Sequence, residues 1–537
     1  MSRGLGDVYK RQILHDISGF ENINTNGNIT LFETVKIAGA ENINLESGNL
    51  TLRVDPTLKD AQGRITGHAL YKNNGTLTSI GGNLVIGLNG LGVDSVVSMG
   101  GTSIDKNIND SWWKDSDHLT TNSLVLDAKF DENGDILVTI KESIPLEPSI
   151  PVAPDKPNLT LDSLYYKKLN KIYQSIVNSE EIGKLANTTL IENKTEEEAL
   201  GNLLVILSQM YANNPYSYMI KGSKDSMKVF EDNMSYLTIK PKKDEYIAQG
   251  KMVYTGVRRD NILAGKNYYG FDIGENNHKT TTSIYGGIGT LEYGLSDKTS
   301  VGIVLGGNNQ SVNYRGSSEI DADSLYLGTF IKSDIDNNIK LMGGIGYQYT
   351  SADATRSAVN NYDSFKTGDR YDINSLNAYI ETKYSYEAKQ NWRVEPKLRL
   401  SYYYVEQDKI DEGYDTQKIT MKTDRYNSNT VDLELGVDFI KSINLEDGKL
   451  KNIISLGMTN VIGDKSKELS GNIIGKDKLG SKIDIQGVRF PDRTGEVSYN
   501  LEYEKTNGLI YTAGVNFEFG EDYNRMTTGT IGIGYKY

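Results

Sequence analysis

The C-terminal stretch of the sequence, residues 497–537, alternates apolar and polar side chains with a period of two. Three segments, at 497–504, 509–519 and 530–537, place Val, Leu, Ile, Tyr, Ala and Phe on one face and mainly Ser, Asn, Glu, Thr and Gly on the other. Successive side chains of a β-strand point to opposite faces, so each segment predicts a strand with one apolar face. This is the pattern of a membrane β-barrel, in which every second residue faces lipid.

The composition of the chain excludes several classes of protein. The mean hydropathy is −0.47, and no run approaches the roughly 18 apolar residues that a transmembrane helix requires. With 54 Gly and 35 Tyr against 3 Trp and 11 Phe, any interfacial aromatic belt must consist mainly of tyrosine. A net charge of −13 argues against a nucleic-acid partner. The absence of cysteine excludes disulfides and Cys-ligated metal sites.

Residues 246–537 predict a transmembrane antiparallel β-barrel of about 12 strands. The best segments reach the roughly 9–11 residues that a tilted strand needs to cross the hydrocarbon. Short turns, such as 334–337, alternate with long polar connections, such as 408–428. Residues 251–258 are a further candidate strand. The twelve segments lie near 265–273, 281–294, 299–314, 321–334, 337–350, 371–386, 391–406, 427–442, 449–462, 495–505, 508–520 and 526–537.

A soluble β-sandwich is the alternative, because its strands also alternate. Two features favour the barrel. The apolar faces end repeatedly in tyrosine, and the opposite faces carry both signs of charge, as expected for a wet lumen. Closure into a barrel also leaves no unpaired sheet edge in lipid.

The alternation assigns side chains to the two faces of this barrel. Aromatic residues on the apolar faces predict a girdle at the membrane interface, formed by Tyr347, Tyr349, Tyr402, Tyr404, Phe517 and Phe519. Charged residues on the opposite faces predict side chains that point into the lumen, namely Arg393, Glu395, Lys397, Arg399, Asp432, Glu434, Asp438 and Glu518.

Residues 13–143 predict the end of a β-solenoid with a capping hairpin. The pentapeptide GNITL at 27–31 recurs 21 residues later as GNLTL, a spacing close to one rung of a parallel β-helix. Alternating residues on both sides of the 131–134 turn predict a hairpin that covers the exposed end of the solenoid. Trp112 and Trp113 are expected to pack there, with sugar stacking as the alternative. A generic all-β domain with Gly-Asn turns is the other interpretation of this region.

The segments that flank this region have different characters. Residues 1–12 lack the apolar core of a signal peptide and do not join the repeat pattern, so we expect a non-native or disordered start of a chain truncated from a longer precursor. Residues 144–158 contain five of the ten prolines, which predicts a semi-rigid linker. Residues 159–245 show helical apolar spacing and predict a helical connector, whose third run, 223–234, is expected to thread the barrel lumen.

Several motifs resemble a known family. SIYGG at 283–287, LEY at 291–293, SVGIVLG at 300–306 and IGIGYKY at 531–537, together with the order solenoid, helices and barrel, resemble a type V autotransporter of a Gram-negative outer membrane. The resemblance implies an all-β protein with a helical connector, in which a translocator barrel follows a right-handed parallel β-solenoid passenger. The C-terminal signal read by the barrel-assembly machinery would consist of Ile531, Ile533, Tyr535 and Tyr537.

The resemblance also implies partners and a location. The barrel would lie in the outer membrane as a monomer, contacting outer-membrane lipid, and would assemble with periplasmic chaperones. The passenger would be displayed on the cell surface, as an adhesin for a ligand on a host or neighbouring cell. No cofactor and no nucleic acid are expected. Some members of the family cut their passenger free at an Asn-Asn peptide; Asn213 and Asn214 precede Pro215 and are interpreted as a helix terminus, so no self-cleavage is expected.

Catalytic motifs are not found. The four histidines, His15, His68, His118 and His278, are scattered without metal-binding spacing, and the chain has no Gly-x-Ser-x-Gly motif. We therefore predict no catalytic, metal or cofactor residues, while an enzyme domain preceding the passenger remains open. A passive porin-like channel and a secreted carbohydrate-binding or lyase solenoid are the alternative functions.

Overall fold

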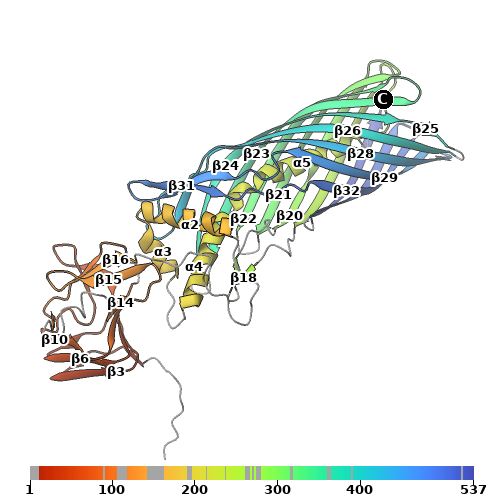
Figure 1. Ribbon diagram of the computed structural model, residues 1–537. Coiled ribbons are helices and arrows are strands. Elements are labelled where there is room, and N and C mark those ends of the chain that lie inside the picture. The colour runs from red at the N-terminus through yellow and green to blue at the C-terminus, as the bar shows by residue number, and fades with distance from the viewer. Residues whose placement is uncertain are drawn as a thin grey trace, which may run out of the picture.

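The chain folds into an elongated molecule with three successive parts (Figure 1). An N-terminal stack of short strands (residues 11–141) is followed by a group of helices and then by a long barrel, whose C-terminus lies at the end far from the stack. The expectations for residues 1–10, Trp112 and Trp113, the segment 144–158 and Asn213 fall outside the described residues. The computed structural model describes residues 11–88, 91–105, 118–141, 163–189, 196–212, 214–235, 238–259, 266–268, 271–273, 280–314, 318–359, 364–388, 391–521 and 524–537.

The N-terminal stack contains the parallel strand pairing that the sequence repeats predict. Ile29 pairs with Leu50 and Leu31 with Leu52, which are the equivalent positions of the two pentapeptides. One parallel sheet has the order β1 (Arg11–Ile13), β4 (Ile29–Leu31), β7 (Asn49–Arg53), β11 (Asn83–Gly87) and β14 (Leu119–Thr121). A second has the order β13 (Ser103–Ile104), β10 (Thr76–Ser79), β6 (Asn42–Ser47) and β3 (Asn22–Asn26). The short strands β2 (Ile17–Ser18) and β5 (Ile37–Ala38) also pair in parallel.

Close backbone packing explains the glycine of the repeated pentapeptide. Gly48 has a φ of +72°, and a Cβ atom there would lie 2.5 Å from the carbonyl carbon of Gly27 in the neighbouring rung. Only glycine combines this backbone conformation with so near an approach. Inside the stack, Leu52, Leu77 and Leu84 are fully buried, so successive rungs share one apolar core.

The predicted hairpin is present at the end of the stack. β15 (Leu126–Phe130) pairs antiparallel with β16 (Ile136–Ile140), and β16 pairs antiparallel with β12 (Val96–Val97). The same sheet continues through β9 (Ile65–Gly67) to β8 (Asp55–Lys59). The hairpin therefore covers a strand that would otherwise present unpaired backbone groups.

One buried histidine of the stack makes its stability depend on pH. His68 is 5% exposed, and its Nδ1 accepts the amide hydrogen of Leu70, so Nε2 carries the proton and donates to the Ser98 carbonyl at 2.8 Å. Burial lowers the pKa of His68 to about 4, although the Ser98 carbonyl and Asp135 favour the charged form. In the unfolded chain the pKa is near the ordinary 6.5, so the unfolded state binds this proton more readily.

We expect the stack to lose stability as the pH falls from 6.5 toward 4. Because the folded pKa is the lower one, the contribution of His68 is fully present above pH 6.5 and its loss is on the order of 3 kcal/mol across this window. Calorimetry of the full chain should show the transition of the stack moving to lower temperature. His68→Gln keeps an N–H donor but does not titrate, and should remove most of the shift. Equal shifts in both chains would contradict this role of His68.

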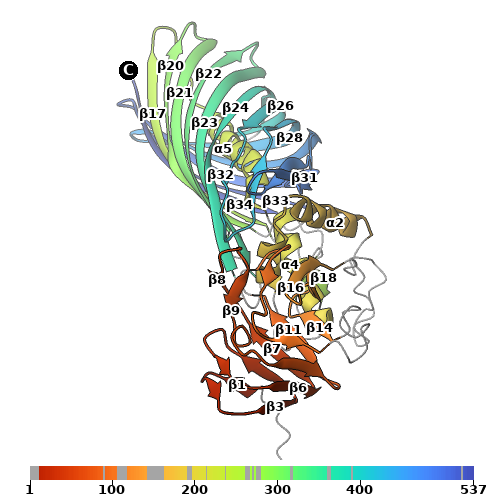
Figure 2. The same ribbon diagram turned by 90° about the vertical axis from the view of Figure 1, so that its left-hand side faces the viewer.

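Most of the helices lie between the stack and the barrel, and the last one lies inside the barrel (Figures 1 and 2). None of the described helices combines the length and the apolar character needed to cross a membrane. Pro215 opens the short 3-10 helix η1, and the side chain of Asn214 caps it by accepting the amide hydrogen of Tyr216. The elements are α2 (Ser163–Asn178), α3 (Ile182–Thr189), α4 (Glu196–Tyr211), η1 (Pro215–Ser217) and α5 (Met219–Ser235).

Twelve long antiparallel strands close the barrel in chain order, which confirms the predicted fold. The last strand pairs with the first: Tyr246 donates its amide hydrogen to Tyr537 at 2.8 Å, and Tyr537 returns the bond at 3.0 Å. The strands are β17 (Tyr246–Arg259), β20 (Thr280–Gly294), β21 (Thr299–Tyr314), β22 (Glu319–Asp334), β23 (Ile339–Val359), β24 (Ser364–Tyr384), β26 (Trp392–Gln407), β28 (Tyr426–Leu445), β29 (Gly448–Gly463), β32 (Arg493–Lys505), β33 (Leu509–Gly520) and β34 (Arg525–Lys536). A two-residue strand, β25 (Tyr386–Glu387), extends the β26 edge.

The prediction of the first barrel strand at 265–273 is wrong. The described part of that segment forms a small hairpin, β18 (Lys266–Tyr268) and β19 (Phe271–Ile273), and β17 takes the first place in the barrel. The outward positions of β17 hold Ala248, Gly250 and Gly256 between Tyr246, Met252 and Tyr254, so its apolar face is interrupted. Its apolar residues Ile247, Val253 and Val257 are instead buried on the inward side.

The two ends of the barrel differ. Tight turns and the C-terminus lie at one end, here called the turn end, and longer connections lie at the other, here called the loop end. At the loop end, residues 408–425 and 464–492 together form a three-stranded sheet. This loop sheet consists of β27 (Thr420–Thr423), β30 (Leu469–Ile474) and β31 (Leu479–Ile485).

Candidate functional site

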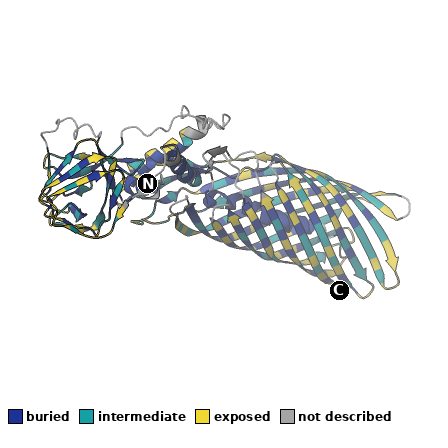
Figure 3. Cartoon of the chain, turned by 90° about the horizontal axis from the view of Figure 1, so that it is seen from below, coloured by how far each residue is buried: buried dark blue, intermediate teal, exposed yellow. Residues whose placement is uncertain are grey.

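The barrel wall alternates between exposed and buried residues along each strand (Figure 3). The aromatic residues assigned to the girdle all lie on the outer face, where five of them are 40–55% exposed and Tyr404 is half-buried. The C-terminal residues Ile531, Ile533, Tyr535 and Tyr537 lie on the same outer face, and are 47–63% exposed. A lipid environment requires an apolar outer face of this kind.

The structure adds a second row of tyrosines at the turn end, which the sequence argument did not single out. Tyr246 and Tyr293 are paired residues of β17 and β20, with ring centroids 4.6 Å apart. Tyr254 and Tyr285, a second pair of the same two strands, lie eight residues closer to the loop end. At roughly 3.3 Å per residue and a tilt near 45°, the two rows are about 19 Å apart along the barrel axis. The barrel thus has an aromatic row on each side of an apolar band.

Helix α5 lies inside the barrel and occupies the central part of the lumen (Figure 2). All of its residues are buried, and it contacts β21, β23, β24 and β26 on the inner wall. Phe230 stacks on Tyr326 with ring centroids 4.6 Å apart. A Cβ atom at Gly306 would lie 2.5 Å from the Phe230 ring, so this glycine makes room for the helix. The predicted lumen segment, 223–234, lies within α5.

Arg399 is the centre of an ion-pair network between α5 and the wall. Its guanidinium lies 2.6 Å from a carboxylate oxygen of Asp232 and 3.4 Å from one of Glu231, both on the helix. From the wall, Glu381 at 3.1 Å and Glu434 at 3.2 Å complete the set. The arginine is 2% exposed. Four carboxylates around one buried guanidinium bind the helix to the barrel through charge-assisted hydrogen bonds.

The other predicted lumen charges also point inward, but most are paired rather than bathed in water. Lys397 pairs with Glu434 at 2.8 Å, and Lys340 with Glu395 at 2.5 Å. The remaining pairs are Lys383–Asp438 at 2.9 Å, Lys224–Asp432 at 2.6 Å, Lys228–Glu518 at 3.2 Å and Arg393–Glu395 at 2.8 Å. The expectation of a wet lumen therefore requires correction, because α5 takes up its central part and supplies partners for the wall.

A second buried cluster closes the loop end above α5. Arg356 donates two hydrogen bonds to the Glu412 carboxylate, from Nε at 2.8 Å and from Nη2 at 2.6 Å. Thr367 and Tyr216 donate their hydroxyl hydrogens to the same carboxylate. Burial opposes ionisation of Glu412, but Arg356 and the hydroxyl donors outweigh it and hold its pKa below the ordinary value. The sequence carries no signal for this cluster, since its members come from four separate segments.

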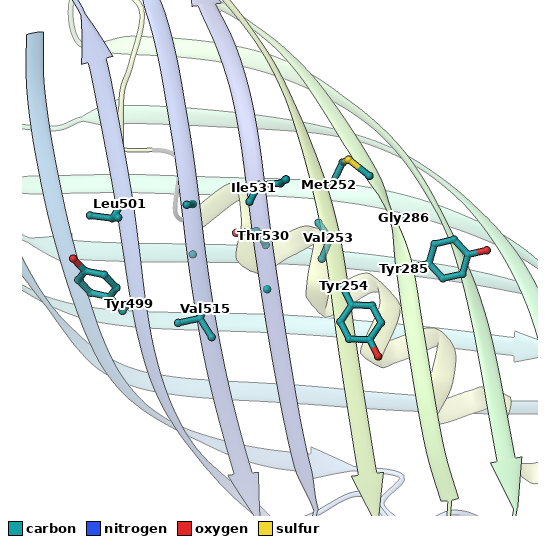
Figure 4. Close-up of a pocket in the computed structure, with 13 residues that line it drawn as sticks. Met252, Val253, Tyr254, Tyr285, Gly286, Tyr499, Leu501, Val515, Thr530 and Ile531 are labelled. Atoms are coloured by element: carbon teal, nitrogen blue, oxygen red, sulfur yellow. The ribbon is translucent and has the colours of Figure 1, made fainter. Parts of the chain in front are cut away.

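A shallow hollow of about 600 Å³ crosses the outer wall where the first and last strands meet (Figure 4). Small residues, Ala513 and Gly529, leave this space, and Tyr254, Tyr285 and Tyr499 surround it. None of its lining residues is charged. An apolar hollow of this kind is compatible with a membrane-facing surface.

Residues 262–516 match the family model of the autotransporter beta-domain. The barrel is an autotransporter beta-domain. The matched residues cover the nine barrel strands from β20 to β32 completely and β33 as far as Asn516, but neither β17 nor β34. This beta-domain is a translocator domain and is not catalytic.

Solved autotransporter domains are similar to this chain at low sequence identity. The translocator domain of autotransporter NalP from Neisseria meningitidis is 11% identical with a TM-score of 0.45, and the match covers 62% of this chain and 100% of that one. The β-domain of the Bordetella autotransporter BrkA is 12% identical with a TM-score of 0.39, over 54% and 98% of the two chains. The transport unit of AIDA-I from Escherichia coli is 13% identical with a TM-score of 0.37, over 57% and 97%. No curated protein sequence matches the chain.

Proposed function

We propose that this autotransporter exports its own N-terminal stack through the outer membrane and keeps it attached at the cell surface. The observation that carries the proposal is the path of α5. The helix runs through the lumen and joins the helices and the stack at the loop end to β17, which begins at the turn end. A chain that crosses its own barrel in this way has its N-terminal part on one side of the membrane and its C-terminus on the other.

The displayed stack is proposed to act as an adhesin. Its rungs present an extended regular surface, which suits a ligand on a host or neighbouring cell. The barrel is proposed to insert as a monomer into outer-membrane lipid, with help from periplasmic chaperones and from the assembly machinery, which would read Ile531, Ile533, Tyr535 and Tyr537. Three of these side chains lie on the outer face of β34 and Tyr537 follows the strand on the same side, where another protein in the membrane can reach them before closure.

Two epitope-tag insertions test the export proposal in cells that secrete the full chain behind a cleavable signal sequence. One tag is placed in the exposed 61–63 turn of the stack, and the other in the 446–447 turn at the turn end. The first tag should bind antibody on intact cells, and the second only after the outer membrane is permeabilised. A stack tag that becomes accessible only after permeabilisation would overturn the proposal.

A passive porin-like channel is less well supported. Such a channel needs an open lumen, whereas α5 occupies the lumen with every residue buried and is bound by the Arg399 network. The soluble lyase or carbohydrate-binding alternative does not explain the apolar outer face of the barrel.

A further inference from the structure

The loop sheet is built from two connections that are far apart in the sequence. β27, from the first connection, pairs antiparallel with β30 from the second, and β30 pairs with β31. Both views place this sheet beside helix α2, outside the barrel wall (Figures 1 and 2). The loop sheet therefore has one face available to the helices that leave the lumen.

Helix α2 buries its apolar face against the loop sheet. Leu169, Ile172 and Ile176 lie on one face of the helix and are fully buried. On the sheet, Ile483 and Ile485 of β31 are also fully buried, and they belong to the same hydrophobic cluster. Helix α4 contacts β31 as well.

Polar groups fix the position of α2 on β31. Lys168 lies 2.7 Å from Glu468, and Lys171 lies 2.8 Å from Asp484. Near the end of the helix, Ser175 donates its hydroxyl hydrogen to the Ser481 carbonyl at 2.6 Å, and Asn178 donates to the Ser481 hydroxyl at 2.6 Å. Basic side chains of the helix thus meet acidic side chains of the second loop.

The backbone of the loop sheet is also shaped for this helix. A Cβ atom at Gly480 would lie 2.2 Å from the Ser175 carbonyl oxygen, and one at Gly475 would lie 2.2 Å from the Ser179 carbonyl oxygen. Any larger residue at either glycine would displace the helix. Close packing, complementary charge and paired hydrogen bonds coincide on one surface.

The helices in turn support the stack. A Cβ atom at Gly183 of α3 would lie 2.5 Å from Cα of Gly92, so α3 and the stack pack backbone to backbone. The structure holds the stack on the barrel through α3, α2 and the loop sheet rather than through a chain connection alone.

We propose that the loop sheet is a receptor for α2. It binds the helix once the helix has left the lumen and prevents its return. This inference rests on the proposed export function. The loop sheet lies only at the loop end, so docking releases free energy only on that side, and it favours outward movement of the chain. The same contacts then fix the exported stack to the barrel.

Adjacent lysines of α2 provide a matched pair of variants. Lys168→Glu reverses the charge that contacts Glu468, whereas Lys167→Glu makes the same change at an exposed neighbouring position. Pulse labelling of the full chain measures how fast the stack tag arrives at the surface. We expect K168E to slow arrival several-fold and K167E to leave it within twofold of the unmodified chain. Equal rates for K168E and K167E would overturn the proposal.

A charge swap separates lost docking from a misfolded helix. The variant K168E/K171E should be slow, and adding E468K/D484K should return the rate to within twofold of the unmodified chain. Failure of the swap to restore the rate, in a barrel that still migrates as a compact form on an unheated gel, would overturn the proposal. If the unmodified chain never shows its tag at the surface, export itself has failed, and the two proposals are thereby distinguished.

The absence of cysteine gives a direct test of where docking occurs. Replacing Asn178 and Ser481 by cysteine places two thiols where side-chain atoms now lie 2.6 Å apart. The disulfide should form in chains whose stack tag is reachable on intact cells and be absent from chains whose tag is still inside. A disulfide equally frequent in both populations would mean that docking does not follow export.

Discussion

Replacing Arg399 by methionine is expected to lower the free energy of unfolding of the barrel by about 3–5 kcal/mol. The guanidinium lies within 3.4 Å of Asp232, Glu381, Glu434 and Glu231. Methionine has a similar length but no charge, so the four buried carboxylates would lose their shared cation. Asp232, Glu381 and Glu434 would each keep a lysine, whereas Glu231 has no second salt bridge among the described residues. Removing one partner of a buried ion pair is far more destabilising than the pair itself is stabilising.

The loss can be measured by the temperature at which the compact gel form of the full chain disappears. Arg393→Met provides the control on the same strand, because Arg393 is partly exposed and its partner Glu395 keeps a second cation, Lys340. Its cost should be about 0–1 kcal/mol, the range of surface ion pairs. Arg399→Lys should fall between the two, since an ammonium group cannot contact several carboxylates in the same planar geometry. Equal melting of R399M and R393M would mean that α5 is not held by this network.

The fate of α5 in the Arg399 variant is part of the same prediction. Two of the four carboxylates, Glu231 and Asp232, belong to the helix, and the repulsion left by the substitution acts between the helix and the wall. We therefore expect α5 to leave the lumen before the barrel unfolds. A rise in ion conductance of the purified chain in planar bilayers, at temperatures where the gel form is still compact, would show this step.

Strand positions could be predicted because the alternation of side chains follows from backbone geometry alone. On β26, Leu398, Leu400 and Tyr402 are 43–48% exposed, while the intervening Lys397 and Arg399 are at most 4% exposed. Alternation does not reveal a strand where its outer face is not apolar. β23 reaches Val359 and β24 begins at Ser364, beyond the predicted 337–350 and 371–386. Near the loop end their outer faces carry polar residues in place of apolar ones, namely Ser351, Asp353, Thr355, Lys366 and Arg370.

The partners of the inward charges could not be predicted from the sequence. Alternation shows that Arg399 points inward. Its partner Asp232 lies 167 residues earlier on a helix, where side chains repeat with a different period from that of a strand. The contact of Arg356 with Glu412 likewise joins a strand to a loop without regular structure. Such pairs depend on how separate elements meet in space, which no local pattern encodes. For the same reason the sequence predicted lumen charges but not the network that binds α5.

Placing arginine at Ile345 is expected to destabilise the barrel by up to about 2–4 kcal/mol, the upper value being the cost of a charge on the lipid face at mid-membrane depth. Ile345 is 61% exposed on the outer face and lies six residues into β23, which begins at Ile339. At roughly 3.3 Å per residue and a tilt near 45°, this is about 14 Å from the turn end, inside the apolar band of about 19 Å between the two aromatic rows.

Ile335 provides a control with the same residue, nearly the same exposure and a different depth. It is 57% exposed and lies in the turn before β23, where water surrounds it if the turn end projects from the membrane. Ile335→Arg should therefore cost about 0–1 kcal/mol, as charges do at the interface. The free energy of unfolding of both variants is measured by urea unfolding in lipid vesicles, with loss of the compact gel form as the readout. In a soluble barrel both positions would face water, so equal small effects at Ile345 and Ile335 would refute the membrane assignment of the outer face.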